Sequence, residues 1–392
     1  MLPAKKTSIY FDNNATTRLL PEVREALHNI IDTPFGNPSS PHSYSDYSRS
    51  ILQKSRGYIS QFLKCFPDQI IFTSGASESN TTIFNALSLK PDTKHSIITT
   101  PSEHSSVTEN CRFLGFRDTD IRVLQINRSG VISLTELADL IEECTPTLIS
   151  IGWASNETGV IQPIKEITEI CKIKGILFHT DASQYIGRGE IDLSAENIDF
   201  LSFTGHKLHS PQGIGCLYVK NPDSMHCLIR GGEQEHGLRA GTENIIGIAG
   251  LGKAINLRMR TLDQSLKKLK KLRNHFEKSI VSSIPNVIIN GVMEERTPNT
   301  SNITFSGIDG RALLAQLDIA GVICSQTSAC TSMIPEPSET LRAMGLSVDE
   351  AFSSLRFSFA VDNTMDEVDR ACVLIKEKIE VIRKFYVLRG AV

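Results

Sequence analysis

The sequence lacks several features that would place it in other classes of protein. No apolar run approaches the roughly 18 residues of a membrane helix. No apolar run follows the start at residues 1–6 either, so we expect neither a membrane span nor a signal peptide. The net charge of −3 gives no basic excess, which argues against direct nucleic-acid binding. We therefore expect a cytoplasmic protein.

The cysteines also lack the arrangement of a disulfide or metal framework. Their number, nine, is odd, and no two stand as Cys-x-x-Cys. We interpret them as reduced thiols, which are typical of the cytoplasm. His206 and His209 lie close together, but no further ligands stand at suitable spacing, so we expect no metal site.

What the chain does have is an alternation of short apolar runs and amphipathic stretches. The runs 70–73, 147–153, 176–178 and 200–203 predict strands, and the stretches 134–141 and 164–174 predict helices. This alternation is typical of a mostly parallel sheet covered on both faces by helices, an α/β fold. From 245 to 284 the pattern is helical throughout, and this long helix is the expected passage into a smaller second domain.

Residues 74–80 form the first candidate site. A glycine and small hydroxyl residues open a helix directly after a strand, and the free N–H groups and the helix dipole there suit a phosphate. The same pattern also describes an ordinary helix N-cap, so the motif alone decides nothing.

Two further candidate sites follow consecutive strands. Asp181 comes directly after one apolar run, and Thr204, His206 and Lys207 come after the next. Taken alone, each has a structural explanation, as a salt-bridge partner, a capping residue or a solvated lysine. Together they suit an electron-sink cofactor. Such a cofactor needs a carboxylate to keep its ring nitrogen protonated and a lysine to carry its aldehyde as an imine.

Residues 325–332 are small and polar, and Pro335 and Pro337 close the segment, which is typical of an exposed, mobile loop. Free cysteines are mostly buried, so Cys330 is unusual in such a place. It is either an accessible nucleophile or an incidental surface thiol.

Taken together, these segments resemble the cysteine desulfurases of the NifS/IscS family. The resemblance covers nearly the whole chain in an ordered series of motifs, at 11–17, 35–40, 73–80, 103–104, 156–160, 178–184, 202–207, 239–242, 325–332 and 356–358. The loop around Cys330 is similar to that of the long-loop group of the family.

The resemblance implies a fold-type-I enzyme dependent on pyridoxal 5'-phosphate (PLP), with a mostly parallel seven-stranded sheet and a smaller α+β domain. Residues 16–258 would form the large PLP-binding domain, and residues 1–15 and 259–392 the small domain that carries the cysteine loop. The enzyme would be a homodimer.

The resemblance also implies a role for each site residue. Lys207 would hold PLP as a Schiff base, and His104 would stack on the ring and help to move protons. The other implied cofactor contacts are Asp181 to the ring nitrogen, Gln184 to the ring hydroxyl, Asn156 nearby, and Ala76, Ser77, Thr204 and His206 around the phosphate, joined by Thr242 from the other subunit.

The implied reaction starts from L-cysteine. Asn156 and Arg356 would hold its carboxylate, and Lys207 would remove its α proton. The Cys330 thiolate would then attack the sulfur, which leaves alanine and a persulfide on Cys330 for transfer to an acceptor protein.

Three positions depart from the family pattern: Thr327 and Glu233 stand where glycine is usual, and Cys324 adds a second thiol. The chain also lacks the longer tail of the housekeeping enzymes. These differences leave the acceptor open, so that iron–sulfur cluster assembly, tRNA thiolation and sulfur modification of DNA all remain possible. Whether selenocysteine is also used stays open as well.

Two other function classes were weighed. An aminotransferase, unlike a desulfurase, has no need of Cys330, and a non-catalytic sulfur carrier has no need of Asp181 and Lys207 together. The basic stretch 267–273 could contact an acidic partner or RNA, but its leucines favour a packed helix with a solvated face.

Overall fold

A computed structural model of the chain describes residues 8–31, 36–88, 95–326 and 336–388. Its largest sheet has seven strands in the order β2-β8-β7-β6-β5-β3-β4. Their bounds are β2 Ile70–Thr73, β3 Ser96–Thr99, β4 Asp120–Val123, β5 Leu148–Ser150, β6 Leu177–Asp181, β7 Phe200–Thr204 and β8 Gly215–Val219. All neighbours pair in parallel except β8, which runs antiparallel to both β2 and β7. The prediction of a mostly parallel seven-stranded sheet is confirmed.

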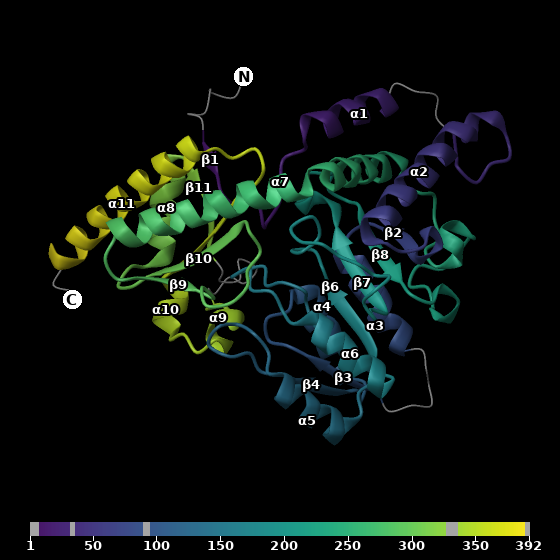
Figure 1. The fold of residues 1–392 in the computed structure, drawn as a ribbon, viewed down its shortest axis with the longest axis horizontal. Coiled ribbons are helices and arrows are strands. Elements are labelled where there is room, and N and C mark those ends of the chain that lie inside the picture. Colours follow the sequence, from purple (N-terminus) through teal and green to yellow (C-terminus); the bar gives the residue numbers. More distant parts are fainter. Residues whose placement is uncertain (1–7, 32–35, 89–94, 327–335, 389–392) are drawn as a thin grey trace.

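Helices cover both faces of this sheet (Figure 1). On one face the buried side chains of α2, α5, α6 and α7 pack against the strands, and on the other those of α3 and α4 do so. The bounds of the helices before the second sheet are α1 Pro21–Ile31, α2 Asp46–Leu63, α3 Ala76–Ser88, α4 Ser105–Gly115, α5 Leu134–Cys144, α6 Ile164–Lys174 and α7 Ile245–Ser283.

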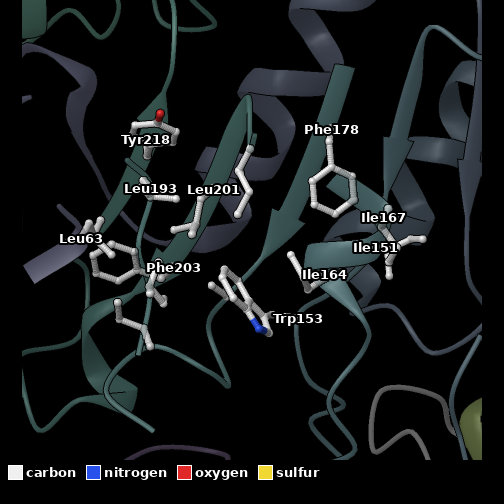
Figure 2. Close-up of a cluster of buried hydrophobic side chains, with 14 of the residues drawn as sticks. Leu63, Ile151, Trp153, Ile164, Ile167, Phe178, Leu193, Leu201, Phe203 and Tyr218 are labelled. Atoms are coloured by element: carbon white, nitrogen blue, oxygen red, sulfur yellow. The ribbon is translucent and has the colours of Figure 1, made fainter. Parts of the chain in front are cut away.

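The core on the first face is built from alternate residues of neighbouring strands. Phe178 of β6 and Leu201 and Phe203 of β7 lie on this side of the sheet, fully buried (Figure 2). Trp153 stacks on Tyr185 with ring centroids 4.6 Å apart. Truncating one of these buried aromatic rings to alanine costs about 3–5 kcal/mol of stability, so this packing fixes the strand ends that carry the site.

A second, smaller sheet lies near the C-terminal helix, in the order β12-β13-β10-β9, with all pairs antiparallel. Beside it, β1 pairs in parallel with β11. The bounds here are β1 Ile9–Tyr10, β9 Val287–Asn290, β10 Thr300–Phe305, β11 Val322–Ile323, β12 Ser325–Gln326, β13 Ser354–Ser358, α8 Gly310–Ala320, α9 Glu339–Ala343, α10 Val348–Phe352 and α11 Met365–Leu388.

The long helix α7 joins the two regions, as its periodicity predicted (Figure 1). Ile248, Leu251 and Ile255 belong to the core of the large sheet, whereas Leu269 and Phe276 belong to that of the small one. The leucines of the basic stretch are therefore packed, as expected. The domain boundary at residue 258 stays a prediction.

No helix in the described ranges combines the length and the apolar character needed to cross a membrane.

Candidate active site

The carboxyl ends of β6 and β7 open into a cavity of about 860 Å³. Ligands in open α/β sheets bind at this edge. The cavity brings together most of the predicted site residues, which are Ala76, Ser77, His104, Asn156, Asp181, Gln184, Thr204, His206, Lys207 and Arg356. Thr242 instead lines a smaller neighbouring cavity of about 250 Å³. Cys330 and Thr327 lie outside the described residues.

Asp181 ends β6, and neighbouring donors hold its carboxylate in place. Its Oδ1 accepts a hydrogen bond from Ser183 N at 2.8 Å, and its Oδ2 accepts one from Asn80 Nδ2 at 3.0 Å. Burial alone would raise the pKa of Asp181, but these two donors and the charge of Lys207 hold it below the usual value. The cavity therefore contains a carboxylate that is ionised at neutral pH.

Lys207 ends a short 3₁₀ turn, Gly205–Lys207, directly after β7. Burial lowers the pKa of its amine to about 8. The charges of Arg188 and Arg356 act in the same direction, and Asp181 opposes them. Such an amine is partly neutral near physiological pH, which an ordinary surface lysine is not. A neutral amine is the form that can attack a carbonyl carbon.

His104 is the N-cap of α4, and its Nδ1 accepts the N–H of Ser106 at 3.1 Å. Burial lowers the pKa of the ring, the charge of Lys207 lowers it further, and Asp181 opposes both. The ring is therefore neutral at physiological pH.

The N-terminus of α3 forms another wall of the cavity. The first N–H groups of a helix have no partner within the helix, so they can bind an anion. Glu78 in this first turn is neutralised by Arg239, at 3.0 Å between Oε1 and Nε. Strand β8 passes so close that a Cβ on Gly215 would lie 2.5 Å from the Cα of Gly75, so only glycine fits there.

His206 and Gln184 are both held by neighbours at the cavity wall. His206 Nδ1 lies 3.1 Å from Thr16 Oγ1, and burial lowers its pKa to about 4, so the ring is neutral. Gln184 Nε2 donates to Asn14 O at 3.1 Å, while its Oε1 accepts a hydrogen bond from the buried Arg188. The orientation of the Gln184 amide is thereby fixed.

Arg356 of β13 reaches the cavity from the smaller sheet. Its Nη1 donates to Asn156 O at 3.1 Å, and its Nη2 pairs with Asp12 Oδ1 at 2.8 Å. Its Nε is buried and has no partner within the described part of the chain. The guanidinium therefore keeps donors that can receive a carboxylate.

Sequence reasoning assigned no role to three groups that the structure places at the site. Asn80 lies inside the predicted helix-opening motif, yet its amide contacts Asp181. Arg188 lies four residues after Gln184, which is the helical neighbour spacing and could have signalled the contact. Glu103 accepts the N–H of Gly152 at 2.9 Å, and burial raises its pKa to about 7.

Comparisons with known proteins agree on one family. A family model described as aminotransferase class-V matches residues 9–371. A cysteine desulfurase of Trichormus azollae is 39% identical over 376 residues, which are 96% of this chain and 94% of that protein. A solved NifS-like protein matches with a TM-score of 0.89 and 33% identity, over 95% of this chain and 100% of that one. The structure of SspA in complex with cysteine matches with a TM-score of 0.80 and 33% identity, over 91% and 100%.

Proposed function

This chain belongs to the cysteine desulfurases of the class-V aminotransferase family, and we propose that it removes sulfur from L-cysteine with PLP held on Lys207. One observation carries the proposal. The ionised carboxylate of Asp181 and the amine of Lys207, with its lowered pKa, line one cavity at the ends of two adjacent strands.

The residues of this cavity fit PLP. Asp181 offers a carboxylate to a protonated ring nitrogen, and the N-terminus of α3 with Ser77, Thr204 and His206 offers donors to a phosphate. Ser183 Oγ, buried and without a partner in the described part of the chain, offers a further polar contact. When bound, PLP supplies an electron sink for the pair of electrons left when the α proton of the substrate is removed.

The other roles fall to the chain's own side chains. Lys207, with its pKa of about 8, can carry the cofactor and can accept a proton at Nζ. Arg356 and Asn156 bind the carboxylate of cysteine at the opposite end of the cavity, which orients the substrate. His104, neutral and at the cavity wall, exchanges a proton with the substrate.

Cys330 receives the sulfur. Its thiolate attacks the sulfur of cysteine, so that the carbon–sulfur bond breaks and a sulfur–sulfur bond forms. The carbon skeleton keeps the electron pair, gains a proton and leaves as alanine. The persulfide on Cys330 then passes to an acceptor. Iron–sulfur cluster assembly, tRNA thiolation and DNA sulfur modification all remain candidate destinations.

The enzyme acts as a cytoplasmic homodimer in this proposal, with Thr242 completing the phosphate site of its partner. Thr242 is exposed in the single chain and lines the smaller cavity that adjoins the main one at Ser74 and Gly213. Mixing Lys207→Ala with Thr242→Ala subunits should give some hybrid dimers with one intact site, and these should regain PLP binding. Hybrids that form without regaining PLP would contradict sharing between subunits.

Borohydride reduction tests the central assignment. The purified protein should absorb as a PLP enzyme, and reduction followed by peptide mapping should place the cofactor on Lys207. Lys220→Ala is the matched control, because Lys220 follows the adjacent strand β8 but does not line the cavity. Alanine release from L-cysteine should be lost in Lys207→Ala and kept in Lys220→Ala. Labelling of a lysine other than Lys207 would show the assignment to be wrong.

A further inference from the structure

A chain of hydrogen bonds runs beneath the cavity and takes no part in the function proposed so far. Its centre is Asn80, fully buried on α3. The Asn80 amide contacts three side chains from three different elements: Asp181 of β6 at 3.0 Å, Ser106 of α4 at 2.9 Å, and Ser202 of β7.

The ionisation of Asp181 sets the direction of these bonds. A carboxylate oxygen carries no proton, so the Asn80 atom that faces Asp181 Oδ2 must be the donor Nδ2. The second proton of the same nitrogen points at Ser106 Oγ. Asn80 Oδ1 is then left to accept the hydroxyl proton of Ser202. The alternative orientation of the amide would place two acceptor oxygens against each other.

The direction continues from Ser106 to His104. Ser106 Oγ accepts from Asn80, so its own proton is free to donate to His104 Nδ1, 2.8 Å away. The backbone N–H of Ser106 donates to the same nitrogen. Two donors at Nδ1 leave no room for a proton there, so the single proton of the neutral ring sits on Nε2.

The chain also continues away from the cavity. Ser202 Oγ has given its proton to Asn80, so it accepts one from His179 Nε2 at 3.2 Å. His179 Nδ1 in turn accepts the proton of Ser150 Oγ at 2.8 Å. Burial lowers the pKa of His179 to about 4, so this ring is neutral and serves both roles at once. Every member of the chain is satisfied in one direction only.

We propose that Asn80 is a positioning residue that links the two sides of the ring site. It holds the carboxylate of Asp181 and, through Ser106, fixes His104 as the tautomer with its proton on Nε2. The proposal rests on the proposed function, because it takes the cavity between Asp181 and His104 as the cofactor site. His104 therefore presents an N–H donor to the cavity and is not available there as a proton acceptor until it has given up that proton.

The tautomer can be measured directly. In the full-length protein labelled with ¹⁵N-histidine, two-bond ¹H–¹⁵N spectra separate the two neutral tautomers, and loss of one ring's signals in His104→Gln assigns the residue. We expect Nε2–H with an unprotonated Nδ1. A proton found on Nδ1 would overturn the proposal. The visible spectrum of the same sample shows independently whether PLP is bound, so failure of this proposal is distinguishable from failure of the proposed function.

Substitution of Asn80 tests the link to Asp181. Asn80→Asp removes both donors and sets a carboxylate against Asp181, so PLP release should quicken by roughly tenfold or more. The Nδ1 resonance of His104 should also move to higher frequency as the Ser106 hydroxyl turns away. Asn110→Asp is the matched control. Its amide also bonds Ser106, but through the carbonyl oxygen, at 2.8 Å. Equal effects of the two substitutions would overturn the proposal.

Ser106→Ala is a second variant, which keeps the proposal testable if Asn80→Asp does not fold. It removes the Oγ between Asn80 and His104 but leaves the bond from Asn80 to Asp181. We expect PLP release to stay within about twofold of the unchanged protein, while the His104 Nδ1 resonance shifts. An unchanged resonance would show that Ser106 does not carry the link.

Discussion

Arg356 Nη2 and Asp12 Oδ1 form an ion pair at 2.8 Å, and both side chains are largely buried. The pair joins β13 to the segment that follows β1, so it ties the arginine of the cavity to the N-terminal part of the chain. A second acceptor, Asn156 O, holds Nη1 at 3.1 Å. The guanidinium is thus held in one orientation before any substrate arrives.

Removing Asp12 should weaken substrate binding more than it slows the reaction. Asp12→Ala leaves Arg356 free to rotate, so we expect the KM for L-cysteine to rise roughly tenfold with a smaller change in kcat, the cost of about one charge-assisted hydrogen bond. Asp12→Asn keeps an oxygen acceptor and should lose less. Steady-state alanine release measures both. A lower KM in Asp12→Ala would show that Asp12 competes with the substrate and does not orient the arginine.

The amine of Lys207 should impose a pH dependence on cofactor capture. Burial lowers the pKa of this amine to about 8, so its neutral fraction rises with pH and levels off above that value. After PLP has been removed, its rate of rebinding should therefore rise about tenfold per pH unit below pH 8 and flatten above it. Stopped-flow absorbance measures the rate. A profile that is flat between roughly pH 6.5 and 9 would contradict the lowered pKa.

A buried ion pair should decide the stability of the loop before Thr242. Arg56 and Glu235 form two contacts, at 2.6 and 3.0 Å, and Glu235 also accepts the N–H of Phe72 at 2.7 Å. Arg56→Met leaves the Glu235 carboxylate buried without its partner, so the free energy of unfolding should fall by about 3–5 kcal/mol.

The control for this loss is the exposed pair of Lys64 and Asp192. Lys64→Met should cost at most about 1 kcal/mol. Urea unfolding at one fixed protein concentration compares the two variants. Similar losses would mean that the burial of the Arg56 pair is energetically unimportant.

The fold could be predicted furthest where periodicity and length agreed. Helix α6 runs from Ile164 to Lys174 as predicted, and α7 ends at Ser283, one residue before the predicted end. Strand β4 was missed because its side chains are mostly exposed and show no apolar run. The place of β8 between β2 and β7, antiparallel to both, depends on long-range pairing that no local pattern encodes.

The site followed the same division. Asp181 and Lys207 could be found because each stands directly after an apolar strand. The role of Asn80 could not, because its partners come from β6, β7 and α4. Only the folded chain brings these elements together, and a buried amide looks like any other helix residue in the sequence.

The last prediction separates the two thiols near the end of the chain. Cys324 lies between β11 and β12 and is buried in the core of the smaller sheet, 7% exposed. Burial raises the pKa of its thiol, and the charge of Asp12 acts in the same direction, so it is protonated at neutral pH and inert. The expectation that Cys324 enters the core is confirmed. We therefore predict that sulfur is accepted by Cys330 and not by Cys324.

Two serine substitutions test this prediction. Cys330→Ser should keep the absorbance of bound PLP and still change its spectrum when cysteine is added. Its alanine release should fall by at least about 10²-fold, because the nucleophile is gone. Cys324→Ser should keep its turnover and lose about 1–3 kcal/mol of stability, since it buries a hydroxyl. The decisive measurement is mass spectrometry of the peptide that carries both residues after brief incubation with cysteine. A persulfide on Cys324, with Cys330 still a free thiol, would reverse the assignment, because a desolvated thiol would then have acted as the nucleophile.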